Sequence, residues 1–222
     1  MSGVGRRAAG VGLRDGAVTL ALICALAVPA SGQTRARDLG IPFDGNPGPL
    51  NAITDVAGVE VGHTTLVRGA GALVQGQGPV RTGVTAILPR GRSGPDTVFA
   101  ATFSLNGNGE MTGTAWIEES GQLEGPILIT NTHSVGVVRD AVIEWNARKS
   151  EGGSYSGDLS LPLVAETYDG FLNDINGFHV RKEHVFAALD GAKSGPVLAL
   201  SSAAKTCSFL PWTPLMSFRK PS

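Results

Sequence analysis

The feature that most constrains the fold is a short apolar run at residues 126–130, which a polar turn at 131–134 separates from a helical pattern at 135–148. In the helical part, Val138, Val142 and Trp145 recur at the spacing that places side chains on one helix face. A strand that leads through a tight turn into such a helix needs a sheet on which the helix can lie. The pattern therefore predicts an α/β fold.

Other segments of the chain extend this pattern. Apolar runs with turn residues at their ends predict strands at 51–65, 84–88, 98–103 and 161–167, and a further helix is expected at 183–193. These strands and helices do not alternate as a regular βαβ repeat would. Layered sheets with helices outside them are therefore favoured over a doubly wound parallel sheet.

Residues 1–32 have the order of an export signal. Arg6, Arg7 and Arg14 precede an apolar stretch at 17–28, and small residues then offer a cleavage position before residue 33. The apolar stretch is shorter than the ~20 residues that a membrane-spanning helix needs. We therefore expect a cleavable signal and a periplasmic or secreted protein, with a twin-arginine signal or lipid attachment at Cys24 as lesser alternatives.

Composition and charge argue against nucleic acid as a partner. Charged residues make up 17% of the chain, the formal net charge is -1, and no run of Lys or Arg is long enough to follow a phosphate backbone. Nucleic acid is therefore not an expected partner. The two cysteines are Cys24, inside the signal, and Cys207, so removal of the signal leaves no intrachain disulfide.

Three polar loops that contain glycine or asparagine follow predicted strands, at residues 106–110, 130–134 and 169–177. Such loops can converge on one pocket, where an asparagine amide can donate to developing negative charge and a carboxylate such as Glu110 can bind an ammonium group. The same residue types also build ordinary turns, and that reading is favoured for each loop taken alone. His133 and Ser134 are neighbours that point apart, and Ser134 is better placed as a helix N-cap than as a nucleophile.

Histidines give no metal-binding motif. His179, Glu183 and His184 do not follow the spacing of the known zinc-hydrolase helices, and a solvated start of a helix is the favoured interpretation. His63 is interpreted as a turn or core histidine. No metal and no cofactor are therefore expected, although a metal-dependent hydrolase remains an alternative that elemental analysis would test.

Four stretches, taken in order, resemble the L-aminopeptidase/D-esterase family, which includes the β-peptidyl aminopeptidases. They are residues 51–63, 106–113, 130–138 and 165–177. The resemblance implies a four-layer αββα sandwich like that of N-terminal-nucleophile hydrolases, made as a precursor that cuts itself into α and β chains. It also implies oligomers of αβ units.

The chemistry implied by this resemblance needs no metal. The hydroxyl of the Ser or Thr that begins the β chain attacks the substrate carbonyl, and its own α-amino group, whose usual pKa is about 8, accepts the proton. Substrates would be small peptides, amides or esters with a free N-terminal amino acid. Either Asn173 or Asn176 matches the asparagine that stabilises the oxyanion, Glu110 matches a substrate-binding position, and Asn106 and Asn108 line that wall.

The resemblance ends near residue 197. Residues 33–197 correspond to the α-chain part, whereas 198–222 lack the glycine-rich run that leads to the family's cleavage point and are expected to be a divergent or frameshifted tail. Gly153-Ser154 is interpreted as a linker rather than a cleavage site. We therefore expect the nucleophile and the β chain to be missing, and the chain alone to be inactive and poorly soluble. The alternative is a secreted binding or structural domain without catalysis.

Overall fold

The computed structural model describes residues 36–92, 94, 97–104, 106–149 and 161–197, which divide into two units at Phe43. In the first unit, the Arg37 guanidinium donates to the Phe43 carbonyl at 3.3 Å and lies 5.3 Å from the centre of its ring. The predicted export signal, both cysteines, Gly153-Ser154 and the divergent tail lie outside the described residues.

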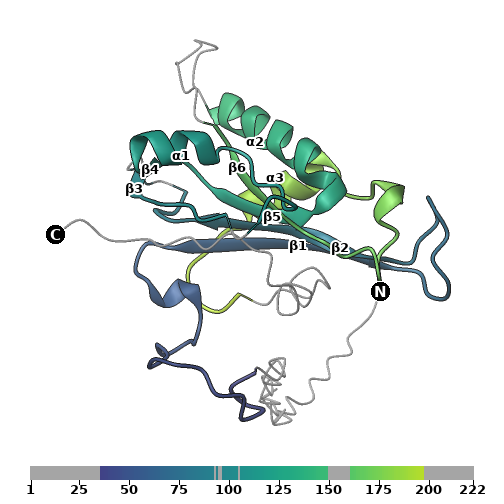
Figure 1. The fold of residues 1–222 in the computed structure, drawn as a ribbon, viewed down its shortest axis with the longest axis horizontal. Coiled ribbons are helices and arrows are strands. Elements are labelled where there is room, and N and C mark those ends of the chain that lie inside the picture. The colour runs from purple at the N-terminus through teal and green to yellow at the C-terminus, as the bar shows by residue number, and fades with distance from the viewer. Residues whose placement is uncertain (1–35, 93, 95–96, 105, 150–160, 198–222) are drawn as a thin grey trace, which may run out of the picture. The chain divides into compact units, whose positions relative to one another are not determined.

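A four-stranded sheet with the order β1-β2-β5-β6 forms the centre of the second unit (Figure 1). β1 (Glu60–Arg68) and β2 (Val80–Leu88) pair antiparallel along their whole length, and β2 pairs antiparallel with β5 (Ile127–Asn131). β5 and β6 (Leu163–Thr167) are parallel. The carboxyl ends of β5 and β6 therefore lie at the same edge as the beginning of β2.

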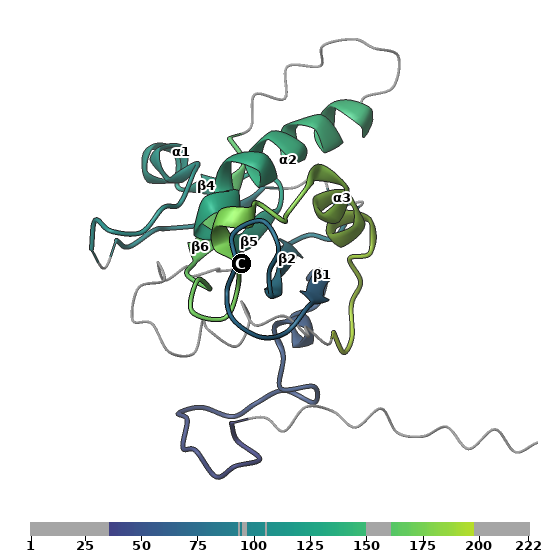
Figure 2. The ribbon, with the colours of Figure 1, turned by 90° about the vertical axis from the view of Figure 1, so that its right-hand side faces the viewer.

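Two helices cover one face of this sheet, as Figure 2 shows. α2 (Val135–Lys149) packs against β5 and β6, and α3 (Lys182–Asp190) packs against β1 and β2. Their shared core consists of fully buried aliphatic side chains, among them Val84, Leu128, Val138, Val142, Val164, Val185 and Leu189. Among the described residues, no helix is both long enough and apolar enough to cross a membrane.

Polar contacts hold α2 against α3. The Trp145 indole N–H donates to the Asp190 carboxylate at 2.8 Å, and the Lys182 ammonium pairs with Glu144 at 2.9 Å and with Asp140. Because the Lys182 pairs are exposed to solvent and therefore screened, aliphatic burial is the larger contribution here.

A smaller cluster flanks the beginnings of β5 and β6. α1 (Thr114–Ser120) and the two-stranded sheet of β3 (Val98–Phe99) and β4 (Gln122–Leu123) contribute Ile117 and Leu123, which pack with Ile127 and Leu163. This second core joins the α1 region to the main sheet.

The predicted class is confirmed: helices lie outside a mixed sheet, and the strands and helices expected near 84–88, 126–130, 135–148, 161–167 and 183–193 are present with shifted ends. The strand expected at 51–65 is instead a 3-10 helix, η1 (Ile53–Asp55), followed by β1. The reason is that the Asp55 carboxylate accepts from the N–H groups of Leu50 and Ala52, at 2.9 and 3.0 Å, and turns the backbone. The strand expected at 98–103 ends at Phe99.

Gly62 of β1 has no space for a side chain, because a Cβ would collide with the Ala188 carbonyl oxygen in α3. Gly62→Ala should therefore force α3 away from the sheet and lower the free energy of unfolding by about 1–3 kcal/mol. Gly136→Ala is the matched control, since nothing lies within 4 Å of a Cβ there and alanine favours the helix by about 0.5–1 kcal/mol. Urea unfolding compares the two, and equal effects would contradict this packing.

Candidate functional site

Two of the three predicted loops meet at the edge where β5 and β6 end. β5 continues into η2 (Thr132–Ser134), and the loop after β6 contains η4 (Ile175–Gly177), which packs against η2. The ring of His133 stacks on that of Phe178, with centroids 5.9 Å apart. His133 is exposed whereas its neighbour Ser134 is buried, so the two side chains point apart as expected. Ser134 is not the expected helix N-cap, because η2, of which it is the last residue, continues directly into α2.

Asn173 connects this loop to the sheet. It is 1% exposed, its side-chain oxygen accepts from the backbone N–H of Arg81 at 3.0 Å, and its amide nitrogen donates to Asp169 at 3.0 Å. Both ends of the side chain are therefore engaged in the fold. The neighbouring Asp174 N–H donates to the Pro79 carbonyl at 2.9 Å, which adds a second link between the loop and the beginning of β2.

The buried polar network continues into the strands. The Asn131 amide donates to the Thr82 hydroxyl at 2.9 Å, and the Thr130 hydroxyl donates to the Gly83 carbonyl at 3.1 Å. Burial raises the pKa of Asp169 above its usual value, against the opposing hydrogen bonds from Thr82 and Asn173. The network therefore contains a carboxyl group that holds its proton more tightly than an exposed aspartate.

Three buried oxygens at this edge have no hydrogen-bond partner among the described residues. They are Oδ1 of Asn131, Oε2 of Glu166 and Oδ2 of Asp169. An oxygen of this kind costs about 1–3 kcal/mol when it is left without a donor. The edge thus has acceptor capacity for a donor such as a hydroxyl, an amide or a protonated amine.

Asn176 lies in the same loop as Asn173 but in a different environment. It is exposed in η4, and its side chain makes no hydrogen bond with any other described residue. The next turn is held by Phe178, whose φ of 50° is in the left-handed region and whose ring stacks on His133. The loop is therefore anchored at Asn173 and near Phe178, while the Asn176 amide between them is open to solvent.

His179 differs from the solvated helix start that the sequence suggested. Its side chain is 6% exposed, and its Nε2 lies 2.9 Å from Oδ2 of Asp174, which is itself 4% exposed. Its Nδ1 lies 2.7 Å from the Arg68 guanidinium. The expectation was wrong because β1, distant in sequence, supplies Arg68 beside it. In the described part of the chain, no group of three His, Cys, Asp or Glu residues could hold a metal ion.

Glu110 is beside the site, whereas Asn106 and Asn108 form a turn ahead of it. The Glu110 carbonyl accepts from the Glu166 N–H at 3.2 Å, and Met111 bridges to Ala165, so this segment runs along the free edge of β6 with the Glu110 side chain exposed. The Asn106 side chain accepts from the Asn108 N–H at 2.8 Å, which is the turn-building role weighed for it. No hydrogen bond between described residues joins Asn106 or Asn108 to the 169–177 loop.

The sequence interpretation gave no role to Thr82, Asn131, Asp174 or His179. One signal was present: Thr82 and Thr130 interrupt apolar strands, and both are fully buried. A buried hydroxyl needs a partner, so such interruptions indicate a polar network inside the fold. The partners in this network are set by the pairing of β2 with β5. No local sequence pattern indicates that pairing.

Asn173→Ala should be much more destabilising than Asn176→Ala. The first change leaves the Arg81 N–H and the Asp169 carboxyl without their partner, at about 1–3 kcal/mol for each buried group. The second removes an exposed side chain and should change stability by less than about 0.5 kcal/mol. Urea unfolding of both variants measures the difference, and similar losses would contradict the anchoring role of Asn173.

Asp169 also predicts a pH dependence. Because its pKa is raised in the folded chain, the folded state binds this proton more tightly than the unfolded state does. The free energy of unfolding should therefore fall as the pH rises from about 4 through the raised pKa. Asp169→Asn removes this ionisation, so its unfolding free energy should fall less over the same interval. Identical slopes for the two proteins in urea unfolding at several pH values would refute this.

Comparison with known proteins identifies the family of this chain. The sequence profile described as peptidase family S58 matches residues 51–202. A β-peptidyl aminopeptidase, BapA, from Sphingosinicella microcystinivorans is 56% identical over 185 residues, which cover 83% of this chain and 46% of the relative. This chain thus spans about half the length of that curated relative.

Solved structures agree. The L-aminopeptidase D-Ala-esterase/amidase of Ochrobactrum anthropi, described as a variant of the Ntn-hydrolase fold, superposes with a TM-score of 0.66 at 48% identity, over 74% of this chain and 46% of that one. A β-aminopeptidase of a Burkholderia species gives 0.63 at 50% identity, over 73% and 44%. The resemblance in the four motifs and the expected fold are therefore confirmed, and the chain belongs to peptidase family S58.

Proposed function

We propose that this chain forms one half of a serine-type aminopeptidase that releases N-terminal amino acids from small peptides, amides or esters. Membership in peptidase family S58 supports the peptidase class, and the names of the relatives support aminopeptidase activity. The observation that carries the proposal is the exposed Asn176 on a loop that buried contacts hold in place.

Asn176, rather than Asn173, is the proposed oxyanion donor. An oxyanion donor must point its N–H at the substrate without reorganising during the reaction. The Asn173 amide already donates to Asp169, and releasing it would remove one of the donors to this buried carboxyl. The Asn176 amide is exposed and makes no hydrogen bond with any other described residue. Asn173 is instead a positioning residue for this loop.

The unpartnered acceptors at the ends of β5 and β6 support the binding of a protonated amine or another donor. Glu166 Oε2 and Asp169 Oδ2 lack donors among the described residues, and the Glu110 segment lies along β6 next to Glu166. A substrate with a free amino group would bring N–H donors and positive charge to this acidic edge. Glu110, which is exposed, is the proposed contact for that ammonium group.

The nucleophile and the base are assigned to the part of the relatives that this chain does not span. In the proposed reaction, a Ser or Thr hydroxyl at a new N-terminus attacks the substrate carbonyl and passes its proton to its own α-amino group. The C–N bond then breaks, the leaving amine takes the proton, and water hydrolyses the acyl-enzyme ester. Assembly of αβ units into a homo-oligomer, and a periplasmic or secreted location, are part of the same proposal.

Complementation tests this function. The chain is expressed alone, or together with a polypeptide equivalent to the half of the 56% identical relative that it does not span. Release of p-nitroaniline from aminoacyl-p-nitroanilides is then measured after host peptidases are removed. We expect no activity from the chain alone and measurable activity from the pair. Asn176→Ala in the pair should lower kcat by about 10²–10³-fold.

Gln75→Ala is the matched control, because it removes an exposed side-chain amide from the connection between β1 and β2. Its kcat should equal that of the unaltered pair. Activity of the chain alone that disappears in Asn176→Ala would refute the division of the site between two halves. A properly assembled pair without activity would instead favour a binding or structural role.

A further inference from the structure

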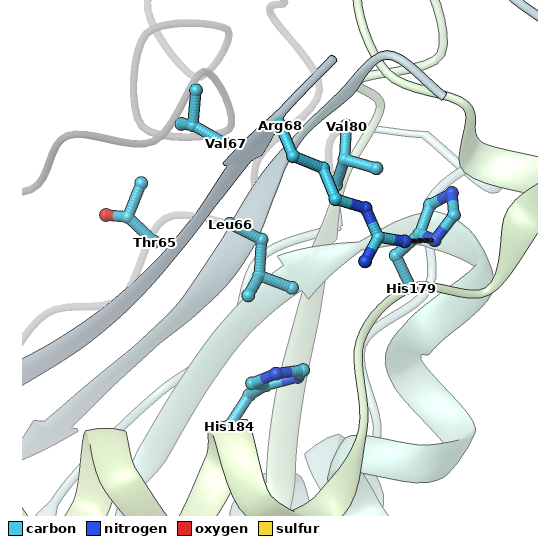
Figure 3. A pocket seen from close by; sticks show the side chains of 7 residues that line it. All are labelled: Thr65, Leu66, Val67, Arg68, Val80, His179 and His184. Carbon is cyan, nitrogen blue, oxygen red and sulfur yellow. Dashed lines mark hydrogen bonds between the residues drawn. The ribbon is translucent and has the colours of Figure 1, made fainter. Parts of the chain in front are cut away.

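A pocket of about 220 Å³ opens between the end of β1 and the beginning of α3, and Figure 3 shows its lining side chains. None of them belongs to the proposed oxyanion or amine-binding positions. The pocket is lined by Thr65, Leu66, Val67, Arg68, Val80, His179 and His184.

Existing hydrogen bonds determine which ring nitrogens of His179 and His184 can donate and which can accept. Arg68 can only donate, so Nδ1 of His179 accepts from it and Nε2 carries the proton toward Asp174. In the same way, the backbone N–H of Arg181 donates to Nδ1 of His184 at 2.9 Å, which leaves the proton of the neutral ring on Nε2. Neither histidine therefore has a free acceptor atom.

Arg68 adds positive charge to this set of donors. One nitrogen of its guanidinium bonds His179, and the other groups of the fork have no hydrogen bond with any other described residue. In Figure 3 the guanidinium lies on the same side of β1 as His184, with Leu66 between β1 and the histidine. Burial and the positive charges of Arg181 and Arg68 lower the pKa of His184, against the charge of Glu183. The ring is thus kept neutral as a donor.

The walls of the pocket restrict the size and character of an occupant. Leu66 and Val80 contribute aliphatic surface, whereas the Val67 side chain points to the other side of β1 (Figure 3). The volume is below the ~300–1,000 Å³ typical of sites for drug-sized ligands. No acidic side chain lines the pocket, and the nearby Asp174 is paired with His179, so a cation would meet the charge of Arg68 without a carboxylate to bind. An anion gains the guanidinium fork, which matches the two oxygens of a carboxylate.

We propose that this pocket binds a small carboxylate with a short aliphatic chain. The carboxylate accepts from the Arg68 guanidinium and from Nε2–H of His184, and the chain lies against Leu66 and Val80. The pair of Arg68 with His179 and Asp174 connects this site to the loop that carries Asn176. The proposal does not depend on peptidase activity, so either can fail without the other.

Saturation-transfer NMR tests the binding on the 222-residue chain, because signals of a small ligand in excess require only dilute protein. Butyrate is the probe, butylammonium has the same chain with the opposite charge, and inorganic phosphate is an anion without the chain. We expect saturable transfer to butyrate, none to butylammonium, and displacement of butyrate by propionate at lower concentrations than by phosphate.

Arg68→Gln should weaken butyrate at least tenfold, and Arg68→Lys, which keeps the charge but not the fork, should weaken it less. Arg92→Gln is the matched control: it makes the same change of charge at the opposite end of β1, where Arg92 pairs with Glu60. It should leave butyrate binding unchanged. Thermal unfolding by circular dichroism confirms that each variant is folded.

Three results would overturn the proposal. They are absence of saturable butyrate binding to the folded chain, equal binding by folded Arg68→Gln, and preferential binding of phosphate or butylammonium. If Arg68→Gln does not fold, His184→Phe replaces it, since it keeps a ring in place but removes the Nε2 donor. Unchanged butyrate affinity in that variant would also refute the site.

Discussion

The hydrogen bonds of Asn173 are the contacts on which the candidate site depends. A single buried side chain accepts from the backbone of β2 through Arg81 and donates to Asp169, which follows β6. β2 and β6 are not neighbours in the sheet, since β5 lies between them. Asn173 therefore joins the polar edge across an intervening strand, and together with the bond from the Asp174 N–H to the Pro79 carbonyl it holds the 169–177 loop.

Much of the fold could be predicted from local pattern. Local sequence predicted β5 from the apolar run before Asn131, α2 from the helical spacing between Val138 and Trp145, and β6 from the apolar segment at 161–167. Because β5 and β6 are parallel, their carboxyl ends lie at the same edge of the sheet, and the loops that follow them converge there. The two asparagines could not be separated in this way. They are three positions apart in similar sequence, and only the pairing of β2 with β5 decides which one is buried. The burial of His179 could not be predicted from local sequence either, because its partner Arg68 lies on a distant strand.

The loop separates two sites with opposite hydrogen-bonding character. On the side of β5 and β6, oxygens of Asn131, Glu166 and Asp169 lack donors among the described residues. On the side of β1 and α3, Arg68 and His184 present donors without free acceptors. The chain belongs to peptidase family S58, and its curated relative is about twice as long as the matched region. The acceptor-rich edge suits an amine, or a donor from the part of the relatives that this chain does not span. The donor-rich pocket suits an anion.

Asn173 holds the loop through buried hydrogen bonds, whereas the Asn176 amide is exposed. Solvent exchange of the two side-chain amides, measured by NMR on the isotope-labelled chain after assignment, tests this difference. We expect slow exchange for the Asn173 amide, which is buried and bonded to Asp169, and fast exchange for the exposed Asn176 amide. Fast exchange at Asn173, or protection at Asn176 equal to that at Asn173, would contradict it.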